Sequence, residues 1–266
     1  MRANLLSLQS TANLMGATQF RLATGNKVNS ALDNPSSFFA AQGLNNRASD
    51  MSGLLDGMGQ SVQTLKAADE GIKGLTKLVG QAKAIAQEAN TRAVGADVSD
   101  VATSYTDLLA QIDTFITDTG YHGVNLLNGD TMKTQFNEDN SSSQDVTGVT
   151  YDASGLGLTT GAAAFGALGV KVQATVDAEI GNIDAALTDL RNTARDFGNS
   201  LSIIQTRQDF TSGLINVLKD GAAALTIADK NEEAANMLAL QTSQQLGIQA
   251  LSLASQANQS VLRLFQ

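Results

Sequence analysis

A spacing of apolar residues by three and four positions recurs along this sequence, and it limits the possible folds more than any other feature. Such a spacing places its members on one stripe of an α-helix, which is buried only when a partner helix covers it. We therefore predict a mostly α-helical protein in which long helices pack together. The stripe recurs in five segments, at 1–22, 51–89, 98–115, 176–218 and 237–265.

The runs at 51–89 and 176–218 are the longest, and each predicts a helix of about 60 Å at 1.5 Å per residue. An ordinary helical bundle would explain one such run, but five runs in sustained register favour an elongated, coiled-coil-like rod. Pro35 is the only proline, so the commonest helix breaker is absent from nearly the whole chain. The residues predicted to pack the rods are Leu65, Ile72, Leu75, Val79, Ile183, Leu187, Leu190, Phe197, Leu201 and Ile204.

The two ends of the chain are free of acidic residues and are rich in apolar ones. Residues 1–27 and 234–266 contain no Asp or Glu, so all 26 acidic residues lie in between. Disordered tails usually have the opposite composition. Leu6, Leu14 and Leu253 lie outside the predicted stripes, so these helices need partners on more than one side. We expect neighbouring copies of the chain to supply them.

Two segments interrupt the helical pattern. Residues 23–37 are rich in Gly, Asn and Ser, and residues 120–173 contain several turn signals followed by a Gly/Thr/Ala-rich stretch. Within the second segment, Thr134–Phe136 and Val146–Tyr151 predict two short β-strands. We expect a small β-hairpin region there.

The sequence offers no constellation of residues for catalysis or metal binding. It contains no cysteine, and its single histidine, His122, lies in a turn without nearby ligand-type residues. The net charge of −9 argues against nucleic acid as a partner. No apolar run is long enough for membrane insertion, and no cleavable signal peptide is evident. We predict a protein that is not an enzyme, takes no cofactor and, if secreted, uses another export route.

Three stretches resemble bacterial flagellins. Residues 21–38, RLATGNKVNSALDNPSSF, resemble the signature that follows the first terminal helix of that family. Residues 121–129, YHGVNLLNG, are similar to its turn after the second rod helix. Residues 228–265 resemble its C-terminal helix. The order of these stretches and their distances from the ends also match the family.

The resemblance implies a flagellin fold with small domains only. Residues 1–24 and 232–266 would be the terminal helices (D0, the filament core), joined through linkers at 25–37 and 221–231. Residues 38–120 and 174–220 would be the long rods (D1), with the turn and β-hairpin region of D1 at 121–173. The implied function is self-assembly into the hollow helical flagellar filament used for motility. The partners implied are other flagellin subunits, the flagellar cap, hook-associated proteins and an export chaperone.

The resemblance also assigns residues to these parts. The implied location is extracellular, in the filament, after type III export. Compared with the family, the chain is expected to begin about ten residues into the first terminal helix. The linker residues would be Arg21, Thr24, Gly25, Asn29, Ser30, Asp33, Asn34 and Pro35, and the residues packing D0 in self-assembly would be Leu5, Leu8, Met15, Leu22, Leu240, Leu251, Val261, Leu262 and Phe265.

Two other classes of structural or signalling protein share parts of this pattern. A hook–filament junction protein would have similar ends but a more divergent middle. A chemoreceptor-like signalling hairpin is also rich in Ala and Gln with heptads, but it should carry transmembrane helices and a charged tip, and neither is evident. The sequence therefore favours a flagellin over both.

Overall fold

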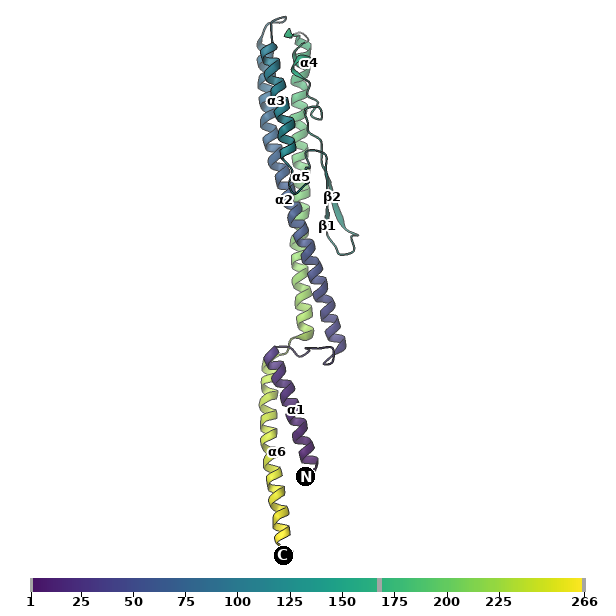
Figure 1. Ribbon diagram of the computed structural model, residues 1–266, viewed down its shortest axis with the longest axis vertical. Helices are drawn as coiled ribbons and strands as arrows, with labels where there is room; N and C mark the ends of the chain where they lie inside the picture. The colour runs from purple at the N-terminus through teal and green to yellow at the C-terminus, as the bar shows by residue number, and fades with distance from the viewer. Residues whose placement is uncertain (1, 167–168, 265–266) are drawn as a thin grey trace. The chain divides into compact units, whose positions relative to one another are not determined.

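The computed structural model describes residues 2–166 and 169–264, and side chains as far as residue 256. Most of these residues are helical, and the strands form a single two-stranded antiparallel sheet within the described part of the chain (Figure 1). The mostly helical fold and its small hairpin, both predicted above, are confirmed. The elements are α1 (Arg2–Thr24), α2 (Pro35–Thr91), α3 (Ser99–Asp118), β1 (Thr131–Gln135), β2 (Ser143–Thr147), α4 (Gly161–Phe165), α5 (Gln173–Thr226) and α6 (Lys230–Leu264).

The contacts divide the chain into two compact units. The first contains the residues up to Ser49 and those from Leu214 onward, and the second is Asp50–Gly213. The first unit thus contains the terminal helices and also the start of α2 and the end of α5. The terminal part expected from the sequence, 1–24 and 232–266, does not include those two helix ends. The start of α2 and the end of α5 contact each other, since a Cβ on Gly221 would lie 3.5 Å from Leu44 Cδ1. Lys27 N and Val28 N, which follow α1, donate to Thr226 O at the end of α5.

The core of the second unit is the seam between α2, α3 and α5, which lie side by side in Figure 1. The predicted spacing places the core residues on the inner stripe of each helix. Leu187 and Leu201 are partly buried against that core. The other rod residues named from the sequence are buried in it: Leu65, Ile72, Leu75, Val79, Ile183, Leu190, Phe197 and Ile204.

A buried carboxylate links α5 to α3 and to the loop before α4. Glu179 is 2% exposed, and its Oε1 accepts hydrogen bonds from the Tyr105 hydroxyl at 2.6 Å and from Thr159 N at 2.9 Å. Its Oε2 accepts from Thr159 Oγ1 and Asn182 Nδ2. Four donors therefore replace the water that burial removes from this side chain. Burial and the Glu179 contact raise the pKa of Tyr105 well above its usual value.

The hairpin is present where the sequence predicts it, but its strands are shifted. β1 runs from 131 to 135 rather than 134 to 136, and β2 from 143 to 147 rather than 146 to 151. The second strand ends early because the chain turns at Gly148 onto the preceding loop. Gly148 N donates to Asp130 O and Tyr151 N to Leu127 O, and a Cβ on Gly148 would lie 2.4 Å from Asp130 O.

The helix ends also differ from the expected boundaries. Pro35, expected in the linker, is the first residue of α2, because the Asn34 side chain accepts from Ser37 N and caps the helix. The expected linker at 221–231 is reduced to 227–229, because the Ala-rich stretch after Gly221 continues α5 to Thr226. Asp229 Oδ1 then accepts from Asn231 N and Glu232 N at the start of α6.

The two helical runs expected within 38–120, at 51–89 and 98–115, are the separate helices α2 and α3, with a turn at 92–98. The buried Lys171 stabilises the end of α2, because its Nζ donates to Asn90 O and Arg92 O, both at 2.6 Å. The short helix α4, which the sequence did not predict, packs on α3. Its Gly161 lies so close to Ala102 O that an added Cβ would clash.

Candidate self-assembly surface

The terminal helices α1 and α6 pack along a narrow stripe. Leu8 lies directly over Gly247, where a Cβ would come within 2.6 Å of Leu8 Cδ2. Thr11 and Thr18 are buried on the same stripe, at 9% and 6% exposure. Small residues at these positions let the two helices approach closely, and the Thr11 hydroxyl donates to Ser7 O of its own helix at 2.9 Å.

The predicted stripe of α6 matches the structure and that of α1 is partly wrong. In α6, the half-buried side chains are at 237, 240, 244, 247, 251 and 254, the positions that the spacing predicts. In α1, Leu8, Met15 and Leu22 are half-buried as the three-and-four spacing predicts. Counting four residues on from Leu8 and Met15, that spacing selects Ala12 and Gln19, but Thr11 and Thr18 are buried instead. A search for apolar side chains overlooks threonine, although a threonine that bonds its own backbone is easily buried.

Large apolar side chains cover the other faces of both helices. Within the described residues, eight of them on α1 and α6 are more than half exposed, although each would be stabilised by burial. A groove of about 450 Å³ between the helices adds a hollow, lined partly by Leu14, Ala239 and Leu240. The exposed residues are Leu5, Leu6, Leu14, Phe20, Leu238, Leu246, Ile248 and Leu253.

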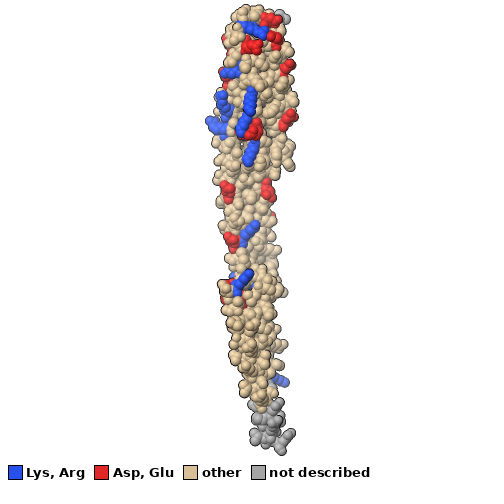
Figure 2. Space-filling view, turned by 90° about the vertical axis from the view of Figure 1, so that its left-hand side faces the viewer, with Lys and Arg blue, Asp and Glu red and all other residues tan. Residues whose placement is uncertain are grey.

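Charge is scarce on this surface. The ion pair between Arg21 and Glu233, with Nη1 and Oε1 3.2 Å apart, joins the two helices near the linkers. Figure 2 shows that the red and blue side chains gather over the second unit and are few on the terminal helices. A surface that is apolar and nearly uncharged suits contact with another apolar surface rather than with water.

The predicted linker residues form a compact, hydrogen-bonded segment that follows the C-terminal end of α1. Asp33 Oδ2 accepts from Asn29 N at 3.0 Å and from Ser30 N at 2.9 Å, and these bonds lower the pKa of the Asp33 carboxyl. Thr24 Oγ1 donates to Phe20 O, and Gly25 adopts φ 73°, which favours glycine.

The two linkers are joined to each other by backbone hydrogen bonds. Lys27 N donates to Thr226 O at 2.7 Å and Ala228 N to Gly25 O at 2.9 Å.

Three of the residues named from the sequence cannot be placed. The side chains of Val261 and Leu262 and the whole of Phe265 lie outside the described residues. Of the other six, Leu8, Met15, Leu22, Leu240 and Leu251 are half-buried between the helices, whereas Leu5 is 61% exposed. The outward residues Leu238 and Leu246 complete the apolar surface and were not named as site residues.

Metal sites and membrane-spanning helices are both absent from the described part of the chain. No group of His, Cys, Asp or Glu there is arranged to hold a metal ion. The described helices include none with the length and hydropathy needed to cross a membrane. His122 adopts φ 50° in an exposed turn. The fold and this surface thus define a class of elongated-helix proteins with apolar, charge-poor terminal helices.

Comparisons with known proteins identify the family. Residues 1–132 match the model of the bacterial flagellin N-terminal helical region, and residues 180–265 match that of the C-terminal helical region. The chain belongs to the bacterial flagellin family and is a structural subunit of the flagellar filament. The resemblance noted in the sequence is confirmed, and nothing in the comparisons favours a hook–filament junction protein.

The similarity extends over nearly the whole chain. Flagellin FljO of Caulobacter vibrioides is 31% identical over 265 residues, covering 98% of this chain and 94% of that protein. A flagellin of Brucella melitensis is 30% identical over 273 residues, covering 98% and 95%. The crystal structure of Bacillus cereus flagellin matches with a TM-score of 0.47 and 18% identity, covering 57% of this chain and 86% of that one.

Proposed function

We propose that α1 and α6 form the inner layer of the filament wall, with the outward apolar residues of each copy packed against the same helices of its neighbours. The observation that supports this is the exposure of large apolar side chains on both helices, among them Leu6 at 71%, Leu238 at 66% and Leu253 at 68%. One α1–α6 pair has no means of covering these faces. Copies arranged head to tail around an axis would cover them and generate an open polymer.

In this proposal the terminal helices are the D0 domain and the second unit supplies D1. The residues proposed for D0 self-assembly include the half-buried Leu8, Met15 and Leu240, which fix the α1–α6 pair, and the exposed Leu5, which reaches a neighbour. The linker around Asp33 would connect D0 to D1, and its own backbone is restrained by several hydrogen bonds.

The same surface bears on the other partners. Apolar helices without a partner promote aggregation, so a soluble export chaperone that covers α6 before assembly suits this chain. The flagellar cap and the hook-associated proteins would contact the same apolar surface of α1 and α6, in the copies at the two ends of the polymer. The chain would be exported and act outside the cell, as a subunit without enzymatic activity.

Charges placed on the outward apolar face test this proposal. Leu253→Asp and Leu238→Asp should each leave a carboxylate without a partner inside the assembled wall. The critical concentration for polymerisation should then rise roughly a hundredfold or more, which corresponds to about 2.8 kcal/mol. Sedimentation and electron microscopy of purified protein measure it, and circular dichroism checks that the monomer keeps its helices.

Leu253→Met and Leu238→Met are the matched controls, because methionine conserves the apolar surface and much of the volume. Both should polymerise like the unmodified chain. Normal filaments from the two Asp variants would contradict the assignment of these helices to the inner layer. Persistent monomers from the unmodified chain would contradict self-assembly itself.

A further inference from the structure

A groove with a surplus of positive charge lies between α2 and α5 in the second unit. Its volume is about 480 Å³, and it is lined by three cations, Lys73 and Lys77 on α2 and Arg191 on α5, and by two carboxylates, Asp69 and Glu70. Lys73 binds Asp69 and Glu70 at 2.7 and 2.8 Å, which raises its pKa.

Three other cations of this face have no acidic partner among the described residues. Lys77, Arg191 and the neighbouring Lys66 make no ion pair with any described residue, although all three are exposed. Lys66, Lys73 and Lys77 share one face of α2, because residues seven and four positions apart align along a helix. Arg195 adds a further cation on the same side of α5 as Arg191, with Asp196 3.7 Å away.

The outer face of α3 has the opposite charge. The helix contains four aspartates and no Lys or Arg, and Asp100 and Asp107 lie seven residues apart on the side away from the core. Asp107 makes no hydrogen bond or ion pair with another described residue.

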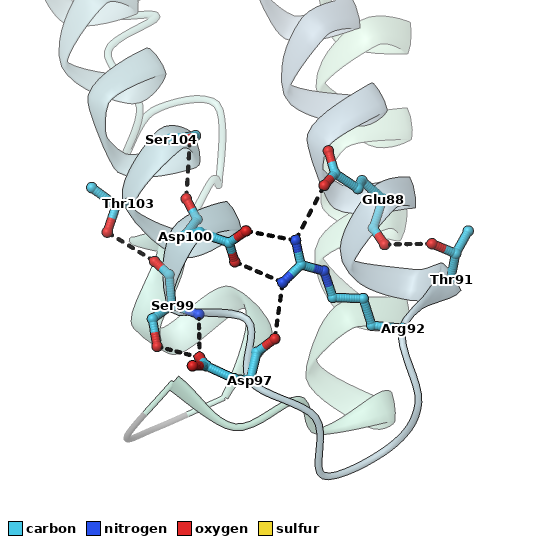
Figure 3. Close-up of polar contacts among 8 residues, drawn as sticks. All are labelled: Glu88, Thr91, Arg92, Asp97, Ser99, Asp100, Thr103 and Ser104. Atoms are coloured by element: carbon cyan, nitrogen blue, oxygen red, sulfur yellow. Dashed lines mark hydrogen bonds and ion pairs between the residues drawn. The ribbon is translucent and has the colours of Figure 1, made fainter.

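The start of α3 adds more negative charge in a fixed geometry. Asp100 binds both terminal nitrogens of Arg92, each at 2.7 Å (Figure 3). Asp97 accepts from Ser99 just before the helix, and Glu88 also contacts the Arg92 guanidinium. Two carboxylates, of Asp100 and Glu88, bind the one guanidinium, which also donates to the main-chain O of Asp97. With the Asp97 carboxylate beside them, this tip has a net negative charge.

We propose that the acidic face of α3 in one copy docks on the basic face of α2 and its groove in a neighbouring copy. This deepens the proposed function and rests on it, since the partner is a second copy in the polymer. The two faces are different parts of one chain, so the contact is heterologous and repeats from copy to copy. Opposite charge on the two faces is the observation that selects this occupant.

The spacing of the charges sets the register of the contact. α3 follows α2 through a short turn and runs back along it (Figure 1), so in copies with the same polarity α3 is antiparallel to the neighbour's α2. Asp107 opposite Lys66 then brings Asp100 level with Lys73, because both pairs are seven residues apart. Asp100 keeps its bonds to Arg92, and Lys73 keeps its bonds to Asp69 and Glu70. The same register brings Asp97 level with Lys77, so that the second new pair lies at the acidic start of α3.

An alternative register pairs Asp107 with Lys77 and Asp118 with Lys66, since both are eleven residues apart. It also forms two pairs but leaves the acidic start of α3 without cations, so the register that places Lys77 beside that start is the one proposed.

Cross-linking tests the register directly, because the chain contains no cysteine. Lys66→Cys and Asp107→Cys variants are polymerised as a mixture and oxidised. The expected product is a disulfide-linked dimer that forms in the mixed filament and not in either single-variant filament or in the unpolymerised mixture. Asp209→Cys, at an exposed position of α5, replaces Lys66→Cys as the matched control and should give none. Mixed filaments that give no Lys66–Asp107 dimer would overturn the proposal.

Charge reversal tests the electrostatic basis. Lys66→Glu and Asp107→Lys should each raise the critical concentration roughly tenfold at low salt, and the double variant should return it to within about threefold of the unmodified chain. Lys133→Glu and Asp209→Lys repeat the same charge changes elsewhere and should show no mutual rescue. Additive effects of Lys66→Glu and Asp107→Lys would overturn the pairing.

Failure of this proposal is distinguishable from failure of the proposed function. If the unmodified chain polymerises and the Leu253→Asp variant does not, while no Lys66–Asp107 cross-link or rescue is found, the inner-layer assignment stands and the α3–α2 contact is wrong. If the unmodified chain stays monomeric under all conditions, the proposed function fails first.

Discussion

At Gly74 of α2, the absence of a side chain lets α3 pack closely. A Cβ at this position would lie 2.4 Å from Phe115 Cζ and 3.0 Å from its Cε1, so the ring rests on the helix backbone. Gly71 meets Leu127 and Thr119 in the same way. These glycines lower the intrinsic helix propensity of α2, and close packing with α3 compensates for it.

Gly74→Ala should therefore destabilise the second unit by about 1–3 kcal/mol, because the Phe115 ring must move. Gly80 lies in the same helix, and an added methyl group there would have nothing within 4 Å. Gly80→Ala should instead stabilise the chain by up to about 1 kcal/mol through helix propensity. Urea unfolding of the monomer followed by circular dichroism measures both. Equal effects of the two substitutions would contradict the packing described.

The residues that the sequence predicted best are those of the long seams. Every member of the apolar run from Met51 to Ala89 is buried or half-buried, as is every member of the run from Val176 to Leu218. Periodicity predicts these positions because one face of each helix is covered along its whole length. The outcome at Thr11 and Thr18 differs because the contact there depends on small size, which an apolar pattern does not register.

At the level of elements, the α1–α6 pair depends on the contact between Leu8 and Gly247. Gly247→Ala would place a methyl group 2.6 Å from Leu8 Cδ2 and force the helices apart, at a cost of about 1–3 kcal/mol. Gly16→Ala, in α1 where nothing lies within 4 Å, is the matched control. Amide hydrogen exchange in α1 and α6 of the monomer should speed up in the first variant and slow slightly in the second. The reverse order would contradict the stripe.

The turn between α2 and α3 should lose stability in acid. The bonds to Arg92 lower the pKa of Asp100, and the Ser99 hydroxyl and N–H lower that of Asp97 (Figure 3). Carboxyls with a lowered folded pKa contribute stability above their unfolded value of 3.8, and that contribution is lost as the pH falls through the folded pKa. Urea unfolding at pH 6 and at pH values below 4 measures the loss.

Two variants distinguish the contribution of this turn to acid stability from the contribution of the other acidic residues. Asp100→Asn and Arg92→Gln remove the same contact from opposite sides, so each should flatten the pH profile between pH 6 and 3 relative to the unmodified chain. An unchanged profile in both would show that the Arg92–Asp100 contact contributes nothing to acid stability.

Element boundaries were the least predictable part of the fold. The end of β2 depends on the close approach of Gly148 to Asp130 O and Leu126 O, a contact between segments that no local pattern encodes. The short helix α4 depends on Gly161 packing on Ala102 of α3. The early start of α2 at Pro35 could have been predicted from the sequence, because proline in the first helical turn after an Asn cap is a common helix start.

At the scale of the whole molecule, the flagellin family and the apolar terminal helices both support assembly through contacts of α1 and α6 with neighbouring copies. Acid-free ends were visible in the sequence, and the structure adds which of their residues face inward and which remain for a partner. Leu251 is half-buried between α1 and α6, whereas its near neighbour Leu253 is 68% exposed. Which residues face inward depends on how the two helices pair. The periodicity of the sequence predicted the inward residues of α6 correctly, but those of α1 only in part.

A cryo-electron microscopy map of the filament assembled from this chain tests the central claim most directly. The account predicts that Leu6, Leu14, Leu238 and Leu253 contact the terminal helices of neighbouring copies and lose nearly all of their exposed surface. The same map would show whether α1 and α6 line the inner layer of the wall. A map in which these four side chains face solvent, with the copies held together only through other parts of the chain, would contradict it.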